Sequence, residues 1–293
     1  MRPIWDMIPP SEWNAHLATA LAEDLGTGPE SGDHSSLACF GPKATGTAVL
    51  RAKAPGIVAG MALAPSIFQT MSADIQWNEK VQDGAKVVAG QTLLTAHGPL
   101  TSLLSVERTL LNYLQRLSGI ATQTHLWKQL LVGTTATMLD TRKTTPGWRK
   151  LEKWAVQVGG GRNHRMGLYD YIMLKDNHID FCGGITQAVQ NTQAYLQEHH
   201  LHRRIEVETR NMAEVKEALS LPGVNRIMLD NFSVDACAEA VNKIAGNKET
   251  EASGGITHET LRAYALTGVD YISIGALTHS VPSLDLHFKA EIS

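Results

Sequence analysis

The sequence contains few cysteines. The three are Cys39, Cys182 and Cys237, and no two of them form a CxxC pair. An odd number of widely spaced cysteines does not support a disulfide framework, and the paired thiols of a structural zinc site are missing. We therefore expect reduced thiols and a cytoplasmic location.

Long hydrophobic runs and an excess of charge of one sign are also missing. No apolar stretch approaches the roughly 20 residues that a membrane-spanning helix needs. The first residues, MRPIWDMIPPSEW, lack the apolar segment of a secretory signal. The net charge of −3 provides no general basic field for nucleic acid or an anionic membrane. Any anionic ligand must therefore be held by a local group of positive charges.

The composition that is present is that of a globular protein, with 43% hydrophobic and 19% charged residues over 293 positions. This length is enough for one large domain or two smaller ones. Residues 46–60 and 81–97 alternate apolar and small residues around turn signals such as Asp83-Gly84, which predicts antiparallel strands and hairpins. Residues 105–132 have the apolar spacing of a helix, which we expect to break near Gly119.

After residue 135 short apolar runs alternate regularly with helical stretches. This alternation predicts parallel βαβ units. Because no new GxGxxG motif accompanies the units, we expect an α/β barrel rather than a doubly wound sheet. The apolar runs are 136–139, 171–174, 205–207, 226–229, 250–252 and 271–274, and the helical stretches are 148–157, 184–200, 212–220, 234–244 and 258–267.

Polar residues follow each apolar run or end it. In a parallel barrel the carboxyl ends of the strands meet at one rim, which is where barrel enzymes hold their substrates. A simpler explanation is that strands end wherever polar residues begin, and it accounts for one or two endings more easily than for six. The endings are 140–143, 175–178, Glu206 with Glu208, Asp230 with Asn231, 253–255 and 275–276.

Two of these endings have the composition of phosphate-binding loops. Ser253-Gly254-Gly255 follows a strand and begins a helix, so bare backbone N–H groups and the helix N-terminus favour an anion there. The next unit ends in Ser273-Ile274-Gly275-Ala276, and consecutive late loops of a barrel commonly bind phosphate. The alternative is a pair of ordinary turns.

Positive charge is concentrated between residues 140 and 176, a segment that contains eight Lys or Arg residues and four Asp or Glu residues. Some of them belong to the exposed side of a helix. Arg142, Lys143, Arg165 and Lys175 instead lie in loops or at strand ends. Arginine matches planar carboxylates and lysine matches phosphate, so this group predicts one or two substrates with several negative charges.

Carboxylates and histidines accompany the positive group. Glu206 and Glu208 are two residues apart and face the same side of a strand, where they need lysines, ligand hydroxyls or Mg²⁺ as partners unless they lie at an exposed edge. With Asp230 they predict an acidic patch beside the basic one. His164 and His178 flank the group and are candidates for ligand binding or proton transfer, although an isolated histidine is often structural.

Seven segments together resemble the quinolinate phosphoribosyltransferase (nicotinate-nucleotide pyrophosphorylase, carboxylating) family. The resemblance extends from about Glu23 to the C-terminus, and EDLGTGPESGDHSS is similar to an N-terminal family signature with a short insertion near residues 27–32. The segments are ERTLLNYLQRLSGIAT, LDTRKTTPGWRKLEKWAV, GGGRNHRMGLYDYIMLKDNHI, IEVE, IMLDNF, EASGGI and DYISIGALTHS.

The resemblance implies a fold and an activity. Residues 1–118, joined by 280–293, would form an α/β open-faced sandwich, and residues 119–279 an incomplete, seven-stranded α/β barrel. The implied reaction transfers phosphoribosyl from phosphoribosyl pyrophosphate to quinolinate with loss of CO₂, as a step of NAD biosynthesis. It also implies Mg²⁺ and a homodimer in which Arg108 reaches the quinolinate site of the neighbouring chain.

The resemblance also assigns roles to residues. The catalytic group is Lys143, Lys175, Glu206 and Asp230, and the last two are the expected Mg²⁺ ligands, in direct or indirect contact. The quinolinate site comprises Arg108, Thr141, Arg142, Lys143, His164, Arg165 and Lys175. The phosphoribosyl pyrophosphate site comprises Lys143, Lys175, Glu206, Asp230, Ser253, Gly254, Gly255, Ser273, Ile274, Gly275 and Ala276.

Two other functions would account for parts of this sequence. A related enzyme that uses nicotinate, or a molybdenum-operon homologue, would share much of this pattern. Nicotinate has one carboxylate and quinolinate two, so Arg108, Arg142 and Arg165 together favour the diacid. A carrier module is the second alternative, because residues 46–97 resemble the hairpins of a lipoyl-like domain. Lys86 lacks the surroundings of an acceptor lysine, and that interpretation leaves most of the chain unexplained.

Overall fold

The computed structural model describes residues 3–291, which divide into two compact units. The first unit comprises residues 1–125, 150–160 and 281–293, and the second comprises 126–149 and 161–280. The expected boundary at residue 118 therefore differs from the observed division. Residues 150–160 belong to the first unit, in which Glu152 accepts a hydrogen bond from Arg116 Nη2 at 2.8 Å.

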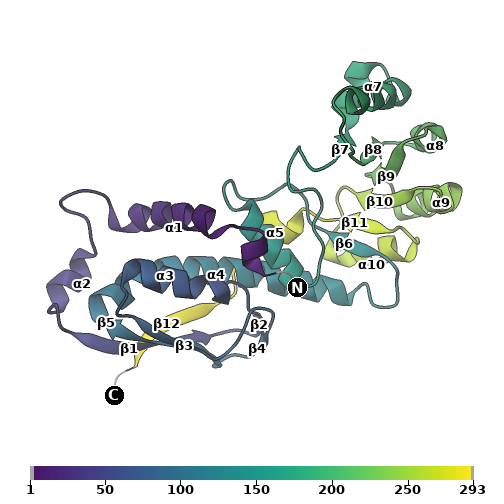
Figure 1. The fold of residues 1–293 in the computed structure, drawn as a ribbon. Coiled ribbons are helices and arrows are strands. Elements are labelled where there is room, and N and C mark those ends of the chain that lie inside the picture. The colour runs from purple at the N-terminus through teal and green to yellow at the C-terminus, as the bar shows by residue number, and fades with distance from the viewer. Residues whose placement is uncertain (1–2, 292–293) are drawn as a thin grey trace. The chain divides into compact units, whose positions relative to one another are not determined.

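The first unit is built on an antiparallel sheet with strand order β12-β1-β5-β3. Helices α3 and α4 lie along one face of this sheet, and α1 lies over them (Figure 1). Trp13 of α1 donates to Ser66 Oγ of α3 at 2.7 Å, and its ring contacts Tyr113 of α4. One covered face is the arrangement of an open-faced sandwich. The strands are β1 (Thr45–Ala52), β3 (Gln76–Glu79), β5 (Thr92–Pro99) and β12 (Leu286–Glu291), with a separate pair β2 (Gly56–Ile57) and β4 (Lys86–Val87). The helical elements are η1 (Ile4–Asp6), α1 (Pro10–Leu25), α2 (His34–Cys39), η2 (Met61–Leu63), α3 (Ala64–Met71), α4 (Leu100–Gln129) and α5 (Arg149–Val158).

Helix α4 continues through Gly119, so the expected break is wrong. Gly119 is buried, and its backbone packs against the chain at Pro282 and Ser283. An added Cβ would meet the carbonyl oxygen of Pro282 and lie 3.0 Å from Cα of Ser283. The glycine therefore permits a close approach of the C-terminal segment, and the sequence pattern gave no means of distinguishing this role from a helix break.

We predict that Gly119→Ala destabilises the protein, although alanine favours a helix interior by about 1 kcal/mol over glycine. Overpacking against backbone atoms costs about 1–3 kcal/mol, because backbone cannot rotate away as a side chain does. The measurement is the free energy of unfolding in urea, with Asn112→Ala on the exposed side of the same helix as the control. A Gly119→Ala protein at least as stable as the control variant would contradict the prediction.

The second unit contains a six-stranded parallel sheet in the order β6-β11-β10-β9-β8-β7. Residue Arg162 forms a parallel bridge with Leu139 on the free side of β6, in the place where a seventh strand would lie. The parallel α/β architecture implied by the resemblance is thus present, with six strands in the sheet and a single bridging residue in place of a seventh strand among the described residues. The strands are β6 (Thr137–Leu139), β7 (Ile172–Leu174), β8 (Ile205–Thr209), β9 (Val224–Asp230), β10 (Glu249–Ser253) and β11 (Tyr271–Ser273).

From β7 onward, helices of the second unit connect the successive strands and lie outside its sheet (Figure 1). All six predicted apolar runs coincide with strands to within a few residues. The helices are α6 (Asp176–Cys182), α7 (Ile185–Glu198), α8 (Met212–Ser220), α9 (Val234–Ile244), α10 (His258–Leu266) and α11 (Ala276–His279). Over residues 3–291, no helix has the length and apolar character needed to cross a membrane.

Candidate active site

A pocket of about 820 Å³ lies at the carboxyl ends of the strands of the second unit. Its walls contain every predicted site residue except Arg108 and Glu206. The convergence predicted from the strand endings is therefore observed, because the ends of β6 to β11 all contribute. The predicted residues in the walls are Thr141, Arg142, Lys143, His164, Arg165, Lys175, Asp230, Ser253, Gly254, Gly255, Ser273, Ile274, Gly275 and Ala276.

Arg108 lies on α4 in the first unit and is exposed. It is absent from the walls of the pocket formed by the second unit. Its expected role in the site of a neighbouring chain stays a prediction. His178 is also outside this pocket. Its Nδ1 accepts a hydrogen bond from the backbone N–H of Lys175 at 3.0 Å, so His178 helps to begin helix α6.

The structure separates the roles of Glu206 and Glu208. Glu208 lines the pocket and its Oε2 lies 3.2 Å from Lys175 Nζ, whereas Glu206 is 2% exposed and lies outside the pocket walls. The two side chains share one face of β8, but residues two apart on a strand differ in height by about 6–7 Å. Glu208 therefore faces the ligand space, and Glu206 lies deeper in the barrel.

The carboxylates of the pocket wall lie beside one another. Burial raises the pKa of Glu208, Lys175 lowers it, and the nearby charge of Asp230 raises it again, so the net direction is upward. Asp230 Oδ2 accepts a hydrogen bond from the side chain of Asn231 at 2.7 Å. Carboxylate oxygens are the donors that Mg²⁺ prefers, so the donor chemistry of Glu208 and Asp230 fits this ion.

The glycine loop after β10 is shaped by its neighbour on β9. Gly254 and Gly255 have φ values of 92° and 60°, in the region that favours glycine. Asn231 also has a positive φ of 56°, and its backbone N–H donates to Ser253 O at 2.8 Å. A Cβ at Gly254 would collide with Asn231. The loop can therefore present its backbone directly to a ligand, as an anion site before a helix requires.

The second loop, after β11, is tied to the basic segment after β6. Thr278 Oγ1 donates to the carbonyl oxygen of Lys143 at 2.8 Å. A Cβ at Gly275 would lie 2.9 Å from the ring of His279 and 3.0 Å from Cδ of Lys143, so the absence of a side chain lets both residues pass close to the backbone of this loop. This is a suitable arrangement for a phosphate held by backbone N–H groups and one lysine.

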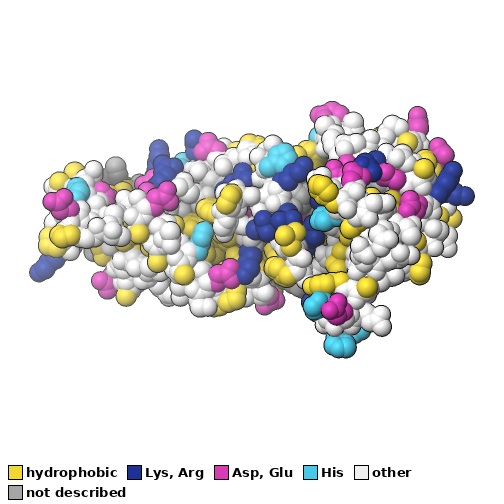
Figure 2. Space-filling model, turned by 90° about the horizontal axis from the view of Figure 1, so that it is seen from above, with side chains coloured by type: hydrophobic (Ala, Val, Ile, Leu, Met, Phe, Trp, Pro, Cys, Tyr) yellow, Lys and Arg dark blue, Asp and Glu magenta, His cyan; other side chains and the backbone are white. Residues whose placement is uncertain are grey.

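Two arginines supply the other positive side of the pocket. Arg165 is 7% exposed, and both burial and the charge of Arg142 lower its pKa. The Nε atom of Arg142 is buried and has no hydrogen-bond partner among residues 3–291. Two partly desolvated guanidinium groups that repel one another favour an anionic ligand with two carboxylates. Figure 2 shows one group of neighbouring Lys and Arg side chains near the middle of the face in view, with others scattered along it, although the net charge of the chain is slightly negative.

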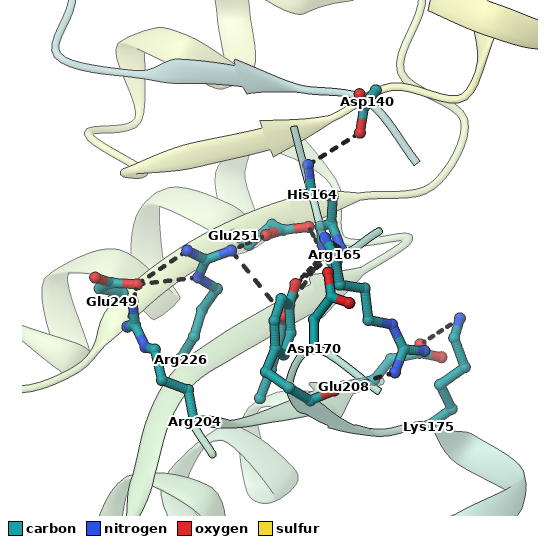
Figure 3. A network of polar contacts seen from close by, with 12 residues as sticks. Asp140, His164, Arg165, Asp170, Lys175, Arg204, Glu208, Arg226, Glu249 and Glu251 are labelled. Carbon is teal, nitrogen blue, oxygen red and sulfur yellow. Dashed lines mark hydrogen bonds and ion pairs between the residues drawn. The ribbon is translucent and has the colours of Figure 1, made fainter. Parts of the chain in front are cut away.

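His164 forms the floor of the pocket and contacts buried carboxylates with its ring (Figure 3). Its Nε2 atom lies 3.2 Å from Glu251 Oε1 and 3.5 Å from Glu206 Oε2. Its backbone N–H donates to Asp140 Oδ1 at 2.9 Å, and the hydroxyl of Tyr171 lies 2.8 Å from Nδ1. Both ring nitrogens are therefore engaged by the protein, which favours a positioning or electrostatic role over proton transfer to a ligand.

Two contacts of His164 act on its charge in opposite directions. The backbone N–H of Arg165 points at Nδ1 at 2.9 Å, which suits a neutral ring. Burial also lowers the pKa of His164, but the contacts with Glu206 and Glu251 outweigh it and raise the pKa to about 9. The carboxylates decide the charge, because an ion pair at this distance interacts more strongly than a single amide dipole.

The three side chains His164, Glu206 and Glu251 also resemble a metal-binding set, since their ligand atoms lie within 4.8 Å of one another. A cation already occupies this region. The Nη1 atom of Arg226 lies 2.7 Å from Glu251 and 4.0 Å from Glu206. The group is therefore explained as a buried ion network, and the pocket carboxylates fit Mg²⁺ better than Glu206 does.

Several residues of the site were missed by the sequence interpretation. Arg226 is a charge at the start of an otherwise apolar run, and that interruption was the available signal, whereas Glu251 lies in a polar strand whose sequence gave no sign that its side chain is buried. Tyr171 was counted only as part of an apolar run. Met173, Met228 and His279 carried no signal that separates a pocket wall from a core or a surface.

Comparisons with known proteins agree with this geometry. The model of the quinolinate phosphoribosyl transferase C-terminal domain matches residues 120–289, and that of the N-terminal domain matches residues 33–118. A quinolinate phosphoribosyltransferase [decarboxylating] of Nicotiana tabacum is 43% identical, covering 94% of this chain and 81% of that protein. A probable nicotinate-nucleotide pyrophosphorylase [carboxylating] of Bacillus subtilis is 43% identical, covering 92% and 91%. The solved structure of NadC from Streptococcus pyogenes has a TM-score of 0.89 at 38% identity, covering 96% and 97%.

The fold and the pocket define an α/β-barrel protein that is built to hold polyanionic ligands at the ends of its strands. With the two domain matches and the similarity over nearly the whole chain, the assignment becomes specific. The chain belongs to the quinolinate phosphoribosyltransferase family.

We predict that the imidazole of His164 stays protonated through neutral pH and loses its proton near pH 9. The folded-state pKa lies above the ordinary value of 6.5, so this group contributes stability that is fully present below pH 6.5. That contribution is lost as the pH rises through 9. The measurement is an NMR titration of ¹⁵N-labelled histidine, with the His164 signal identified by its loss in His164→Gln. A midpoint near 6.5 would contradict the prediction.

Proposed function

We propose that the pocket transfers the phosphoribosyl group of phosphoribosyl pyrophosphate to quinolinate and releases CO₂. The products are nicotinate mononucleotide, CO₂ and pyrophosphate. The observation that carries this proposal is the single pocket in which Arg142, Arg165, Lys143 and Lys175 face two glycine loops and two carboxylates. Its volume of about 820 Å³ is in the range of sites that enclose small-molecule ligands.

Arg142 and Arg165 bind the two carboxylates of quinolinate, and Thr141 and His164 complete this side of the site. Guanidinium groups form paired hydrogen bonds with carboxylates, and this fixes the plane of the pyridine ring. The loops Ser253–Gly255 and Ser273–Ala276 bind the 5′-phosphate of the second substrate through their backbone N–H groups. Glu208 and Asp230 accept hydrogen bonds from the ribose hydroxyls.

The transfer step then follows from position and charge. The ring nitrogen of quinolinate forms a bond to C1 of the ribose while the bond from C1 to pyrophosphate breaks. Positive charge develops on the ribose and negative charge on the leaving group, so Lys143 and Lys175 stabilise the departing pyrophosphate. The carboxylates of Glu208 and Asp230 stabilise the positive charge that develops on the ribose.

Decarboxylation uses the product of the first step. The quaternary ring nitrogen accepts the electron pair when the adjacent carbon–carboxylate bond breaks and CO₂ leaves. A proton then adds to the ring carbon. A buried site with little water near the leaving carboxylate favours this step, because CO₂ is neutral and the carboxylate is poorly solvated.

Mg²⁺ belongs to the proposal as a companion of phosphoribosyl pyrophosphate. Asp230 and Glu208 would hold it, and it would supply compensation for the charge of the pyrophosphate. This changes the expectation for Glu206, which lies below the pocket wall. A homodimer in which Arg108 of one chain joins the quinolinate site of the other is likewise proposed, as is the cytoplasmic location.

A related activity on nicotinate is the second candidate. The same loops and lysines would serve it, and the specific difference is one carboxylate on the substrate. Two arginines in the pocket wall favour the diacid. The carrier interpretation fails, because both family models match this chain across the segment that suggested it and through the barrel.

We predict that the protein consumes quinolinate only when phosphoribosyl pyrophosphate is present, as followed by the loss of quinolinate absorbance. Turnover of nicotinate without turnover of quinolinate would instead support the second candidate. Neither activity, in protein shown to be folded, would contradict the proposed reaction.

We predict that Arg165→Ala abolishes measurable quinolinate binding and leaves the fold intact. Removing one partner of a buried, hydrogen-bonded charge pair costs about 2–5 kcal/mol, which corresponds to a loss of affinity of at least about thirtyfold. Calorimetry measures the affinity, and Arg203→Ala, on the exposed surface of the same unit, is the matched control. Undiminished affinity in Arg165→Ala would refute the role of Arg165.

A further inference from the structure

Opposite charges alternate from the surface of the second unit to the floor of the pocket (Figure 3). Arg204 Nη2 lies 2.6 Å from Glu249, and Arg226 Nη2 lies 3.0 Å from the same carboxylate. Arg226 Nη1 continues to Glu251 at 2.7 Å, and Glu251 continues to His164 at 3.2 Å. The side chain of Arg204 is 53% exposed and that of Glu251 is fully buried. The series therefore links solvent to a residue of the binding site.

Arg226 is held rigidly in the middle of this series. Its Nε and Nη2 atoms contact Glu249, its Nη1 atom contacts Glu251, and its Cζ lies 3.9 Å from the ring centroid of Tyr271. The two glutamates lie two residues apart on β10, on the same side of the strand. A planar guanidinium group suits this arrangement, because it donates from both of its edges at fixed angles.

The fixed position of Arg226 has a direct consequence for Glu251. A fully buried carboxylate needs compensation for the loss of water, and Glu251 has a cation beside each of its oxygens. Arg226 holds Oε2, so Oε1 is left to face the ring of His164. Without Arg226 the carboxylate would lose this anchor and would turn toward its one remaining cation.

A movement of the His164 ring would reach the ligand side of the pocket. The backbone N–H of Arg165 points at Nδ1 of the ring at 2.9 Å. Because a protonated ring cannot accept from this N–H, the link that holds runs through Tyr171, whose hydroxyl lies 2.8 Å from Nδ1 and whose carbonyl oxygen accepts from Arg165 Nη1 at 3.4 Å. Arg165 is the proposed ligand of a quinolinate carboxylate. A displacement of about 1 Å at a substrate-binding group can change a rate by about a hundredfold.

We propose that Arg226 is a positioning residue for substrate binding: through Glu251 it sets the orientation of His164 and thereby of Arg165 at the pocket floor. Arg226 lies outside the pocket walls, so it acts through its neighbours rather than by touching the ligand. The inference deepens the proposed function and rests on it for the identity of the bound diacid.

The test compares Arg226→Met, Arg226→Lys and Arg204→Met. Methionine removes the charge and the hydrogen bonds, lysine keeps the charge without the fork, and Arg204→Met removes the exposed end of the series as a matched control. The readouts are the KM for quinolinate, the KM for phosphoribosyl pyrophosphate, kcat, and the NMR signal of His164 in the ligand-free protein.

The proposal predicts that Arg226→Met raises the KM for quinolinate by about tenfold or more, with a much smaller change for phosphoribosyl pyrophosphate. The His164 signal shifts in the same variant. Arg226→Lys recovers part of both effects, and Arg204→Met matches the unmodified protein. A folded Arg226→Met protein with an unchanged His164 signal, or with equal losses for both substrates, would overturn the proposal.

Two other outcomes of the experiment also decide the proposal. If Arg226→Met does not fold, Arg226→Lys and Glu251→Gln replace it, and an unchanged His164 signal in both would overturn the proposal. If the unmodified protein shows no turnover, the proposed reaction fails by itself. The NMR comparison then still decides whether Arg226 orients His164, since it is made without substrate.

Discussion

The structure depends on the compensation of charges that a parallel barrel brings together. The carboxyl ends of β6 to β11 meet at one rim, so every polar group placed there shares the same small space. Arginines and lysines next to one another repel, so an anion between them is favourable, and buried carboxylates need a cation. At the rim, the bound ligand supplies negative charge to the arginines and lysines. Deeper in the barrel, Arg226 supplies positive charge to the buried carboxylates.

Carboxylates at the rim and carboxylates deeper in the barrel have different cationic partners, as Glu208 and Glu206 illustrate. One step of two residues along β8 separates a side chain that contacts Lys175 in the pocket from one that contacts His164 in the interior. Burial and the neighbouring Glu251 raise the pKa of Glu206. Burial would also raise the pKa of Glu251, but His164 and Arg226 lower it. The two pKa values are therefore shifted apart, so that the negative charge favours Glu251, which lies beside both Arg226 and His164.

Much of the fold was predictable from local pattern, because apolar runs and helical periodicity report what each segment buries. The rim residues were predictable as well, since they follow directly from where those runs end. The depth of a side chain inside the barrel was not predictable. Alternation along a strand shows which side of the sheet a residue faces, but not how far it lies from the rim. Gly119 and Arg226 show a second limit: their roles depend on contacts with residues 282–283 and with β10, which are distant in sequence.

The central claim is that a single pocket at the strand ends of the second unit holds both polyanions. A crystal structure of the protein with quinolinate and a non-reactive analogue of phosphoribosyl pyrophosphate tests it most directly. The account predicts the pyridine carboxylates on Arg142 and Arg165 and the 5′-phosphate on the loops Ser253–Gly255 and Ser273–Ala276. Either ligand bound elsewhere, with this pocket containing only solvent, would contradict it.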